Sequence, residues 1–300
     1  MRYPTVKQLR YFVALCDHRH FGRAAQACFV SQSAFSTAIQ ELERLLGTAL
    51  VDRTNRRVTI TAAGQEVCAR ARRTLTDLED LVEVAGQCRD PLCGSIRLGV
   101  IPTIAPFLLP RVLPKLRKSY PLLRLYLTED RTERLHERLL DGELDVLLLA
   151  LPYELRRVEE LKLFRDRFLL AYREGTSRVD PGQYQFTRLD PNSILLLEDG
   201  HCLRDHTLAA CKIRDSDKIS RYAATSILTL VEMVDADLGI TYLPEMARGS
   251  ALMRNTKVKL APIGDSASRT IGLAWRKGSA RAEEFRLLGR FLKQHAAPPS

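Results

Sequence analysis

The feature that most constrains the fold is a short stretch between two helical patterns near the N-terminus. It reads Phe29-Val30-Ser31-Gln32, and Ser31 can cap a following helix because its hydroxyl accepts a free backbone N–H. That helix is predicted to reach about Leu46, and Gly47 ends it. Its apolar face consists of Phe35, Ile39, Leu42 and Leu46. The chain is therefore expected to form two helices joined by a tight turn.

Two helices are predicted before this turn and a hairpin after it. The first helix spans Thr5 to Asp17, and the second is short. Residues facing inward recur at helical spacing, namely Val6, Leu9, Phe12, Val13 and Cys16 in the first, and Phe21, Ala24, Ala25 and Cys28 in the second. Residues 49–61 predict two short strands around a turn at Asn55. Residues 1–61 are thus expected to form a winged helix-turn-helix domain.

Positive charge is concentrated in this N-terminal part. Residues 1–73 hold 12 Lys and Arg against 5 Asp and Glu, a net charge of +7 out of +10 for the whole chain. Such an excess in a small domain indicates a polyanionic partner, here double-stranded DNA. The third helix would present Ser31, Gln32, Ser33, Ser36 and Thr37 to the major groove, and the wing would place Arg53, Arg56 and Arg57 on phosphates or in the minor groove. The alternatives are a basic surface tuned for solubility and a helical bundle without a DNA partner.

A long helix is predicted from Ala62 to about Gly86, within a linker region of residues 62–90. Its apolar positions follow a heptad seam, made by Cys68, Ala71, Leu75, Leu78, Val82 and Ala85. An isolated helix of this length is marginal in water, so we expect the seam to pack against the same helix of a second subunit. Packing against the chain's own domain is the alternative. Residues 87–94 then predict a hinge that contains Cys88 and Cys93, for which a metal or redox role stays open.

From Ser95 onward, apolar strand-like runs alternate with amphipathic helices. This pattern predicts an α/β regulatory domain, residues 95–300, with a mostly parallel sheet covered on both faces. The number of elements favours two lobes with a cleft between them. We assign lobe I to residues 95–164 and 268–300, and lobe II to residues 165–267. Ligand sites in such sheets lie beyond the carboxyl ends of strands, where Thr103, Thr132 and His201-Cys202 fall.

The seven cysteines are scattered, and the chain shows neither a signal peptide nor an apolar run long enough to span a membrane. A cytoplasmic protein is expected, in which a cysteine pair that oxidises does so transiently. No metal site is predicted, because His201, Cys202, His206 and Cys211 match no compact zinc spacing. No cofactor is expected.

The segment HFGRAAQACFVSQSAFSTAIQELERLLGTALVDR resembles the winged helix-turn-helix of LysR-type transcriptional regulators. This family joins that domain by a linker helix to a two-lobed domain like a periplasmic binding protein. Four further segments resemble the peroxide-sensing branch of the family: GVIPTIAPFLLP, LLLEDGHCLRD with a second cysteine nine positions after the first, YAATSILTL and RTIGLAWR. Phe35 stands where the family usually has Leu, and Lys212 and Arg214 stand where acidic or apolar residues are common.

The resemblance implies roles for individual residues. Cys202 matches the cysteine that peroxide oxidises, and Cys211 matches the one that resolves it as a disulfide. Residues expected around them are Thr103, Thr132, His201, Arg204, Asp205 and Arg269. A thiolate is the reactive form, and a helix start at Cys202 together with Arg204 would favour it. If residues 203–212 are helical, the two Cα atoms lie roughly 13–14 Å apart, while a disulfide tolerates less than about 7 Å. Disulfide formation would then require partial unwinding.

The sequence therefore predicts a DNA-binding regulator activated by hydrogen peroxide. Its expected partners are promoter DNA, peroxide, a second copy through the linker helix and a further pair in a homotetramer, with RNA polymerase as another candidate. The alternative is a LysR-type regulator that responds to a small metabolite bound between the lobes. An enzyme, such as a thiol peroxidase fused to a DNA-binding domain, is the third hypothesis, and no separate catalytic set in the sequence favours it.

Overall fold

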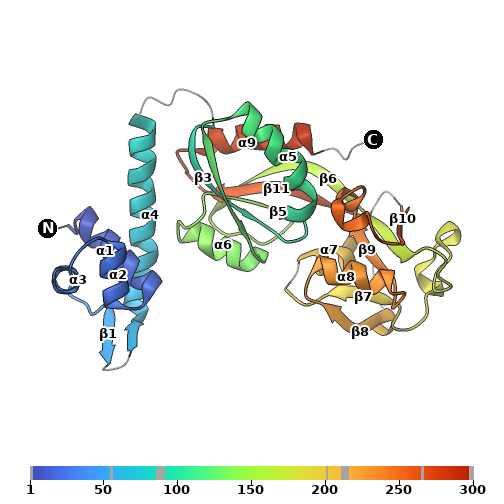
Figure 1. Ribbon diagram of the computed structural model, residues 1–300, viewed down its shortest axis with the longest axis horizontal. Helices are drawn as coiled ribbons and strands as arrows, with labels where there is room; N and C mark the ends of the chain where they lie inside the picture. Colours follow the sequence, from blue (N-terminus) through green and yellow to red (C-terminus); the bar gives the residue numbers. More distant parts are fainter. Residues whose placement is uncertain are drawn as a thin grey trace. The chain divides into compact units, whose positions relative to one another are not determined.

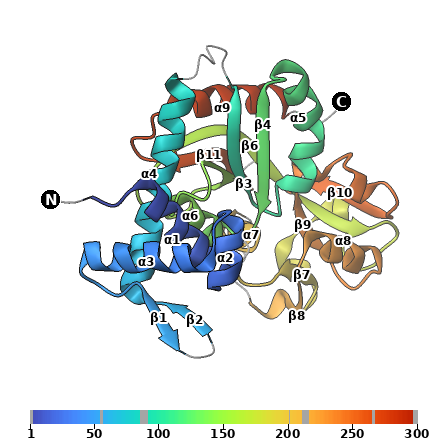
Figure 2. The same ribbon diagram turned by 60° about the vertical axis from the view of Figure 1, so that its left-hand side comes forward.

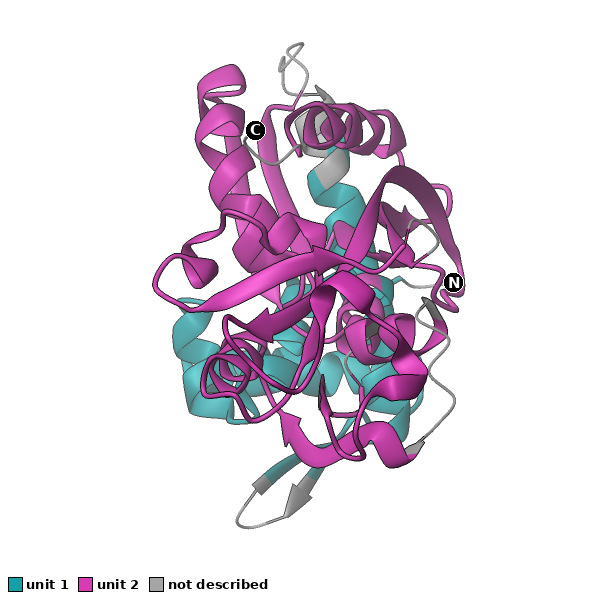
Figure 3. Ribbon diagram, turned by 90° about the vertical axis from the view of Figure 1, so that its right-hand side faces the viewer, with its two compact units in different colours: residues 1–89, 140–143 teal, residues 90–139, 144–300 magenta. Residues whose placement is uncertain are grey.

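The structure of the chain is a computed structural model that describes residues 3–54, 57–85, 92–200, 202–210, 216–264 and 267–296. It divides into two compact units, coloured separately in Figure 3. Unit 1 comprises residues 1–89 and 140–143, and unit 2 comprises residues 90–139 and 144–300. Within the described ranges, no helix combines the length and the apolar character that crossing a bilayer requires.

Unit 1 is a bundle of helices with a hairpin. Its elements are α1 (Val6–His18), α2 (Phe21–Ala27), α3 (Gln32–Leu46), β1 (Val51–Thr54), β2 (Arg57–Ile60) and α4 (Ala62–Ala85). The Thr5 side chain and Gln8 form a capping box at the start of α1, and the imidazole of His20 accepts two backbone N–H groups at the start of α2. Gly47 ends α3 with φ +68, a left-handed conformation that costs glycine little. These local signals place the helices as the sequence predicts.

The core of unit 1 lies where α1 and α3 meet. Phe12, Phe35 and Ile39 are fully buried, and the Tyr11 ring stacks on Phe35 with centroids 5.1 Å apart. Burying each large side chain contributes roughly 1.5–3 kcal/mol. The prediction that Leu46 faces this core is wrong, because its side chain is 38% exposed. Leu46 is the last helical residue, and the chain turns away there.

β1 and β2 form the expected wing. They pair antiparallel from Val51 with Ile60 to Thr54 with Arg57, and Figure 2 shows the hairpin next to α3. Thr61 follows the hairpin and caps α4, since its hydroxyl accepts the Gly64 N–H at 3.0 Å. The turn at Asn55, together with Arg56, lies outside the described residues.

The N-terminal part of the α4 seam packs inside its own unit. Cys68 belongs to the buried core that α1 and α3 form, and Ala71 is also buried. The packing of α4 on α1 accounts for this burial. Cys68 and Ala71 therefore pack against the chain's own domain and not against a second subunit. The reason is that α1 is short and leaves an apolar face that α4 covers directly. Leu81, nearer the end of α4, is exposed.

Unit 2 is an α/β domain. Its helices are α5 (Ala105–Ser119), α6 (Thr132–Leu140, whose last residue falls in unit 1), α7 (Cys202–Ala210), α8 (Ile227–Asp235) and α9 (Ala282–His295). Its strands are β3 (Gly94–Val100), β4 (Leu123–Glu129), β5 (Val146–Leu151), β6 (Val158–Arg173), β7 (Ile194–Leu197), β8 (Ile219–Ala224), β9 (Thr241–Pro244), β10 (Val258–Pro262) and β11 (Ser268–Arg276). Five short 3-10 helices are η1 (Pro181–Gln183), η2 (Phe186–Arg188), η3 (Ser216–Lys218), η4 (Glu245–Ala247) and η5 (Ala251–Met253). The sequence did not predict β8.

The central sheet of unit 2 is mixed, so the prediction of a mostly parallel sheet is wrong. Its order is β10-β6-β11-β5-β3-β4, with β9 also on β6. Only β3 pairs in parallel, with β4 and β5, whereas β11 and β6 pair antiparallel with their neighbours. Helices connect β3, β4 and β5, which run in parallel, whereas β11 lies between β5 and β6 and runs antiparallel to both.

β6 joins two parts of the sheet. Its residues 158–167 pair with β11, and its residues 168–173 pair with β9 and β10. β6 is therefore one continuous strand of 16 residues that belongs to both parts. Around the first half, α5 and α9 lie together on one face of the sheet and α6 lies on the other (Figure 1). Around the second half lie α8 and the separate parallel pair of β7 and β8.

Candidate redox site and nucleic-acid interface

The connection between β7 and α7 carries the cysteine motif. β7 is buried along its length, and Gly200 then takes φ +87, where a side chain would be strained. Cys202 is the first residue of α7, although only its backbone is described, and His201 lies outside the described residues. The first turn of a helix has unpaired N–H groups and a partial positive charge. Position 202 therefore favours an anionic side chain.

Arg131 fixes this connection from another strand–helix junction. Its Nη1 donates to the Asp199 carbonyl at 3.2 Å, and its Nη2 lies 3.7 Å from the Glu198 carboxylate. A Cβ at Gly200 would lie 2.9 Å from the same Nη1, so the guanidinium of Arg131 would have to shift if residue 200 carried a side chain. Thr132 follows Arg131 and begins α6. The junctions that precede α6 and α7 thus lie against each other, although they are far apart in the sequence.

The Thr132 hydroxyl is buried without a hydrogen-bond partner among the described residues. Leaving a buried hydroxyl unpaired costs about 1–3 kcal/mol. A small polar ligand at this junction would recover that cost. Thr132 is thus a sequence-predicted site residue whose polar atom is available.

Arg204 and Asp205 lie on the first turn of α7 and differ in what they contact. Arg204 donates to the Leu197 carbonyl at 3.1 Å and pairs with Asp199 at 2.9 Å. Its guanidinium thus holds the end of β7 and the following loop in place, while its charge stays near the start of α7. Asp205 is exposed. Of the two predicted residues, only Arg204 is joined to the loop by described contacts.

Arg269 lies at the centre of a buried polar network. Its side chain is 0% exposed, and its Nε donates to Asp166, which is 3% exposed, at 3.0 Å. Its Nη1 donates to the Thr103 hydroxyl at 3.0 Å, and its Nη2 donates to the Thr103 carbonyl at 2.9 Å. Arg269 on β11 is the register partner of Asp166 on β6. Two predicted residues, Thr103 and Arg269, are therefore in direct contact.

Asp166 completes this network, and sequence analysis missed it. Its second oxygen accepts the Met246 backbone N–H at 3.2 Å. Burial raises the pKa of the Asp166 carboxyl, and the charge and hydrogen bond of Arg269 oppose that shift. The only available signal was an acidic residue between Arg165 and Arg167, which does not reveal a partner about a hundred residues away.

His206, four residues after Cys202, is a second residue to which the sequence gave no role in the redox site. Its Nε2 donates to the Pro152 carbonyl at 3.0 Å, so the proton is on Nε2. Its Nδ1 is buried and has no partner among the described residues. Burial lowers the pKa of His206, and the charge of Arg269 acts in the same direction. Residues four apart lie on the same face of a helix, so His206 shares a face of α7 with Cys202.

Other cysteines and candidate metal ligands are only partly described. Cys211, predicted to resolve the oxidised Cys202, lies outside the described residues, as does Cys88 in the hinge. Cys93 is disulfide-bonded. In the described part of the chain, no group of three or more His, Cys, Asp or Glu residues could hold a metal ion.

The candidate nucleic-acid interface is the start of α3. Ser31 caps the helix by accepting the Ala34 N–H at 3.3 Å, and its hydroxyl also contacts that of Ser33 at 3.1 Å. Gln32, Ser33 and Thr37 are exposed, whereas Ser36 is half-buried. The Thr37 hydroxyl donates to a backbone carbonyl of the preceding turn at 3.0 Å. Gln32 and Ser33 are therefore the predicted residues with the most accessible polar groups.

The turn before α3 adds an exposed aromatic residue that the sequence analysis did not assign. Phe29 is 96% exposed and has φ +56, in the left-handed region. On the wing, Arg53 and Arg57 lie in the two strands, but their side chains are not described. Phe29 lies directly before the residues predicted to read DNA.

Comparison with known proteins identifies the class of this protein. Residues 6–65 match the model of the bacterial regulatory helix-turn-helix protein of the lysR family, and residues 89–297 match the LysR substrate binding domain. The chain belongs to the LysR family and is a DNA-binding transcriptional regulator.

Within this family the chain is similar to two differently named groups. The transcriptional regulator EstR of Acinetobacter baylyi is 39% identical over 295 residues, which cover 98% of each chain. The dual regulator OxyR of Escherichia coli is 38% identical over 289 residues, covering 96% of this chain and 95% of OxyR. A full-length OxyR variant from Pseudomonas aeruginosa has a similar structure, with a TM-score of 0.79 at 30% identity, covering 98% of this chain and 96% of that one. Other relatives, 36% and 39% identical, are named hydrogen peroxide-inducible genes activators.

Proposed function

We propose that this regulator is activated by hydrogen peroxide, which oxidises Cys202 and leads to a disulfide with Cys211. The observation that carries the proposal is the position of Cys202 at the first residue of α7, beyond the carboxyl end of a buried strand. The similarity to OxyR and to the peroxide-inducible activators supports the choice of effector.

The chemistry requires a thiolate at Cys202. The thiolate attacks one peroxide oxygen, the O–O bond breaks, and hydroxide leaves and takes up a proton to form water. The resulting sulfenic acid is attacked by the Cys211 thiolate, which forms the disulfide and releases a second hydroxide. The start of α7 and the nearby guanidinium of Arg204 favour the anionic thiolate.

Two threonines and a histidine would orient the peroxide. The Thr103 hydroxyl accepts from Arg269, which leaves its own proton free to donate to a ligand oxygen. The unpaired hydroxyl of Thr132 can donate or accept, and Nδ1 of His206 can accept. Peroxide both donates and accepts, so it can satisfy such a set. The two threonine hydroxyls, as donors, would also stabilise the leaving hydroxide.

The helical form of α7 opposes disulfide formation. α7 spans Cys202–Ala210, and Cys211 is the next residue. A rise of 1.5 Å per residue separates the two Cα atoms by roughly 13–14 Å if the helix continues for one more residue. A disulfide tolerates less than about 7 Å. Oxidation would therefore unwind α7, pull the buried Leu203 from the core, and alter the surface around it.

The remaining partners follow from the same proposal. Ser31, Gln32, Ser33, Ser36 and Thr37 would read promoter DNA, and Arg53, Arg56 and Arg57 would contact its backbone. The later part of α4, where Leu81 is exposed, would form the homodimer, and two dimers would form a tetramer. A rearranged α7 at a subunit interface would then change the spacing of the DNA-binding domains and the contact with RNA polymerase.

The test uses a transcriptional reporter and three variants, each with one cysteine replaced by serine. Cys202→Ser should abolish the response to hydrogen peroxide, and Cys211→Ser should weaken or abolish it. Cys28→Ser is the matched control, because Cys28 is a free thiol in unit 1, and it should respond as the wild type does. A response to peroxide that persists in Cys202→Ser would refute the proposal.

The second candidate is a regulator that responds to a small metabolite bound within unit 2. It is favoured by the similarity to EstR, which at 39% identity is slightly higher than the 38% identity to OxyR. In that case the reporter would respond to a metabolite in the absence of peroxide. All three cysteine variants would respond to that metabolite as the wild type does.

A further inference from the structure

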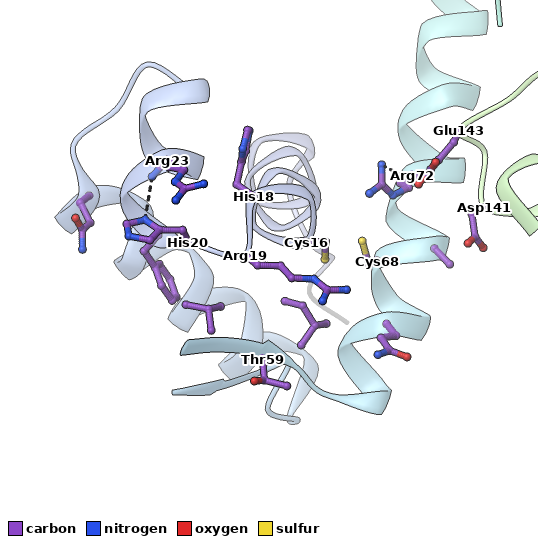
Figure 4. Close-up of a pocket in the computed structure, with 16 residues that line it drawn as sticks. Cys16, His18, Arg19, His20, Arg23, Thr59, Cys68, Arg72, Asp141 and Glu143 are labelled. Atoms are coloured by element: carbon purple, nitrogen blue, oxygen red, sulfur yellow. Dashed lines mark hydrogen bonds and ion pairs between the residues drawn. The ribbon is translucent and has the colours of Figure 1, made fainter. Parts of the chain in front are cut away.

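A second pair of thiols lies in unit 1, far in sequence from the cysteine motif. Cys16 is on α1 and Cys68 is on α4, and both are free. Figure 4 shows the two sulfur atoms facing each other across the two helices. Cys16 is half-buried and Cys68 is 7% exposed. Facing thiols on two packed helices are candidates for an S–S bond, whose length is roughly 2 Å.

A guanidinium lies beside this pair. Arg72 follows Cys68 by four residues, so both side chains are on the same face of α4. Arg72 pairs with Asp17, the residue after Cys16, and its charge favours the anionic form of Cys68. A fixed positive charge is therefore held against one of the two sulfurs by contacts that join α4 to α1.

The two thiols differ in acidity. The hydrogen bond from Cys16 lowers the pKa of Cys68, Arg72 acts in the same direction, and burial opposes both. The pKa of Cys16 is raised by the same hydrogen bond and by burial. Of the two thiols, Cys68 is therefore the one that loses its proton more readily. A reactive thiolate next to a protonated thiol is the arrangement that a peroxidatic and resolving pair needs.

Small solutes can reach the pair. Both cysteines and Arg72 line a pocket of about 1010 Å³ in unit 1 (Figure 4). Cys28, the other free cysteine described in this unit, does not line this pocket, and burial raises its pKa. Cys28 can therefore serve as an internal control, because it is a free thiol of the same unit that does not belong to the pair.

We propose that Cys16 and Cys68 form a second redox site, in which a hydroperoxide converts the two facing thiols into a disulfide between α1 and α4. The Cys68 thiolate attacks one peroxide oxygen, the O–O bond breaks, and the leaving hydroxide (alkoxide, for an organic hydroperoxide) takes up a proton. The sulfenic acid formed at Cys68 is then attacked by Cys16, which loses its proton. The S–S bond forms, the S–O bond breaks, and the second hydroxide takes that proton to form water.

The bond would act on the DNA-binding part of the chain. α1 packs on α3 through the stacked rings of Tyr11 and Phe35, and α4 follows the wing directly. A covalent link between α1 and α4 therefore ties together the two helices that flank the predicted recognition helix and wing. This site is independent of the proposed Cys202 sensor.

The experiment uses the full chain with Cys202→Ser and Cys211→Ser, so that the proposed sensor cannot contribute. The protein is treated with hydrogen peroxide, its remaining thiols are blocked with N-ethylmaleimide, and peptides are mapped without reduction. We expect a linked pair of peptides joined at Cys16 and Cys68, with the loss of two hydrogens. Maleimide on both Cys16 and Cys68 after treatment would overturn the proposal.

Further variants separate the roles of the two sulfurs and guard against misfolding. In Cys16→Ala the linked pair should vanish, and dimedone should trap a sulfenic acid at Cys68. Cys28→Ser is the matched control and should keep the linked pair. Arg72→Met should slow disulfide formation several-fold, with partial recovery in Arg72→Lys, while alkylation of Cys28 stays unchanged and reports an intact fold. Dimedone labelling at Cys28 in place of Cys68 would overturn the assignment of the nucleophile.

Discussion

The change Asp166→Asn tests the buried network beneath the proposed peroxide site. It removes the charge that neutralises Arg269 but alters the side-chain volume very little. Asp166 uses separate oxygens for Arg269 and for the Met246 N–H. Asparagine has one oxygen, so one of these two hydrogen bonds is lost together with the ion pair.

The magnitude follows from the burial of the pair. Removing one partner of a buried ion pair typically costs about 3–5 kcal/mol, because the remaining charge is left uncompensated. Arg269 keeps its two hydrogen bonds to Thr103, which places the expected loss near the lower end, about 3 kcal/mol. A domain is stable by only about 5–15 kcal/mol, so this change is large.

The matched control is a neighbouring pair of the same chemistry at the surface. Arg167 and Glu245 contact each other at 2.9 Å, with side chains that are 49% and 27% exposed. Exposed pairs contribute about 0–1 kcal/mol, so Glu245→Gln should barely change the free energy of unfolding. The two variants therefore separate the effect of burial from the effect of losing an ion pair.

Urea unfolding provides the assay. Trp275 is the only tryptophan of the chain, is buried, and lies on β11 with Arg269. Its fluorescence thus reports on unit 2. With a slope of about 3 kcal/mol per molar urea, Asp166→Asn should lower the unfolding midpoint by roughly 1 M. A shift no larger than that of Glu245→Gln would refute the structural reasoning.

Three further predictions concern the sites directly. Thr132→Val should leave the free energy of unfolding within about 1 kcal/mol of wild type, because no hydrogen bond is lost, but should slow oxidation of Cys202, as stopped-flow mixing with peroxide would measure. Burial lowers the pKa of His206, so the unfolded chain takes up that proton first and stability falls as the pH drops below about 6.5. When the free energy of unfolding is measured at pH 7.5 and 5.5, His206→Gln should lose less stability between the two pH values than the wild type does. An equal loss in both proteins would contradict the assignment of this pH dependence to His206. Changing Arg56 and Arg57 to Ala should weaken binding to all DNA sequences and flatten its salt dependence, whereas altered sequence preference at unchanged affinity would contradict a backbone role for the wing.

Most elements could be predicted from the sequence because their signals are local. Ser31 and Gly47 mark the ends of α3 as expected. The predictions failed where the structure of an element depends on pairing with segments far away in the sequence. The extent of β6 and the existence of β8 depend on which strands they pair with, and the antiparallel β11 depends on how the chain returns through the sheet.

The candidate site shows the same division. The cysteine motif, Thr103, Thr132 and Arg269 could be named from motifs and a resemblance. Asp166 could not, because its partner Arg269 is about a hundred residues away and is brought opposite it only by the register of β6 and β11. Cys68 was assigned to a seam between subunits, whereas in the structure it contacts Cys16 across two helices.

By itself the sequence determined the family, the order of the helices and strands, and the residues suited to DNA and to thiol chemistry. Periodicity, capping and turn preferences act over a few residues, so they can be recognised without coordinates. Only the tertiary structure decided which polar groups meet. It paired Arg269 with Asp166, joined the junctions before α6 and α7 through Arg131, left the Thr132 hydroxyl unpaired, and set Cys16 against Cys68. Burial and charge pairing between distant segments depend on the folded geometry, and no local pattern encodes that geometry.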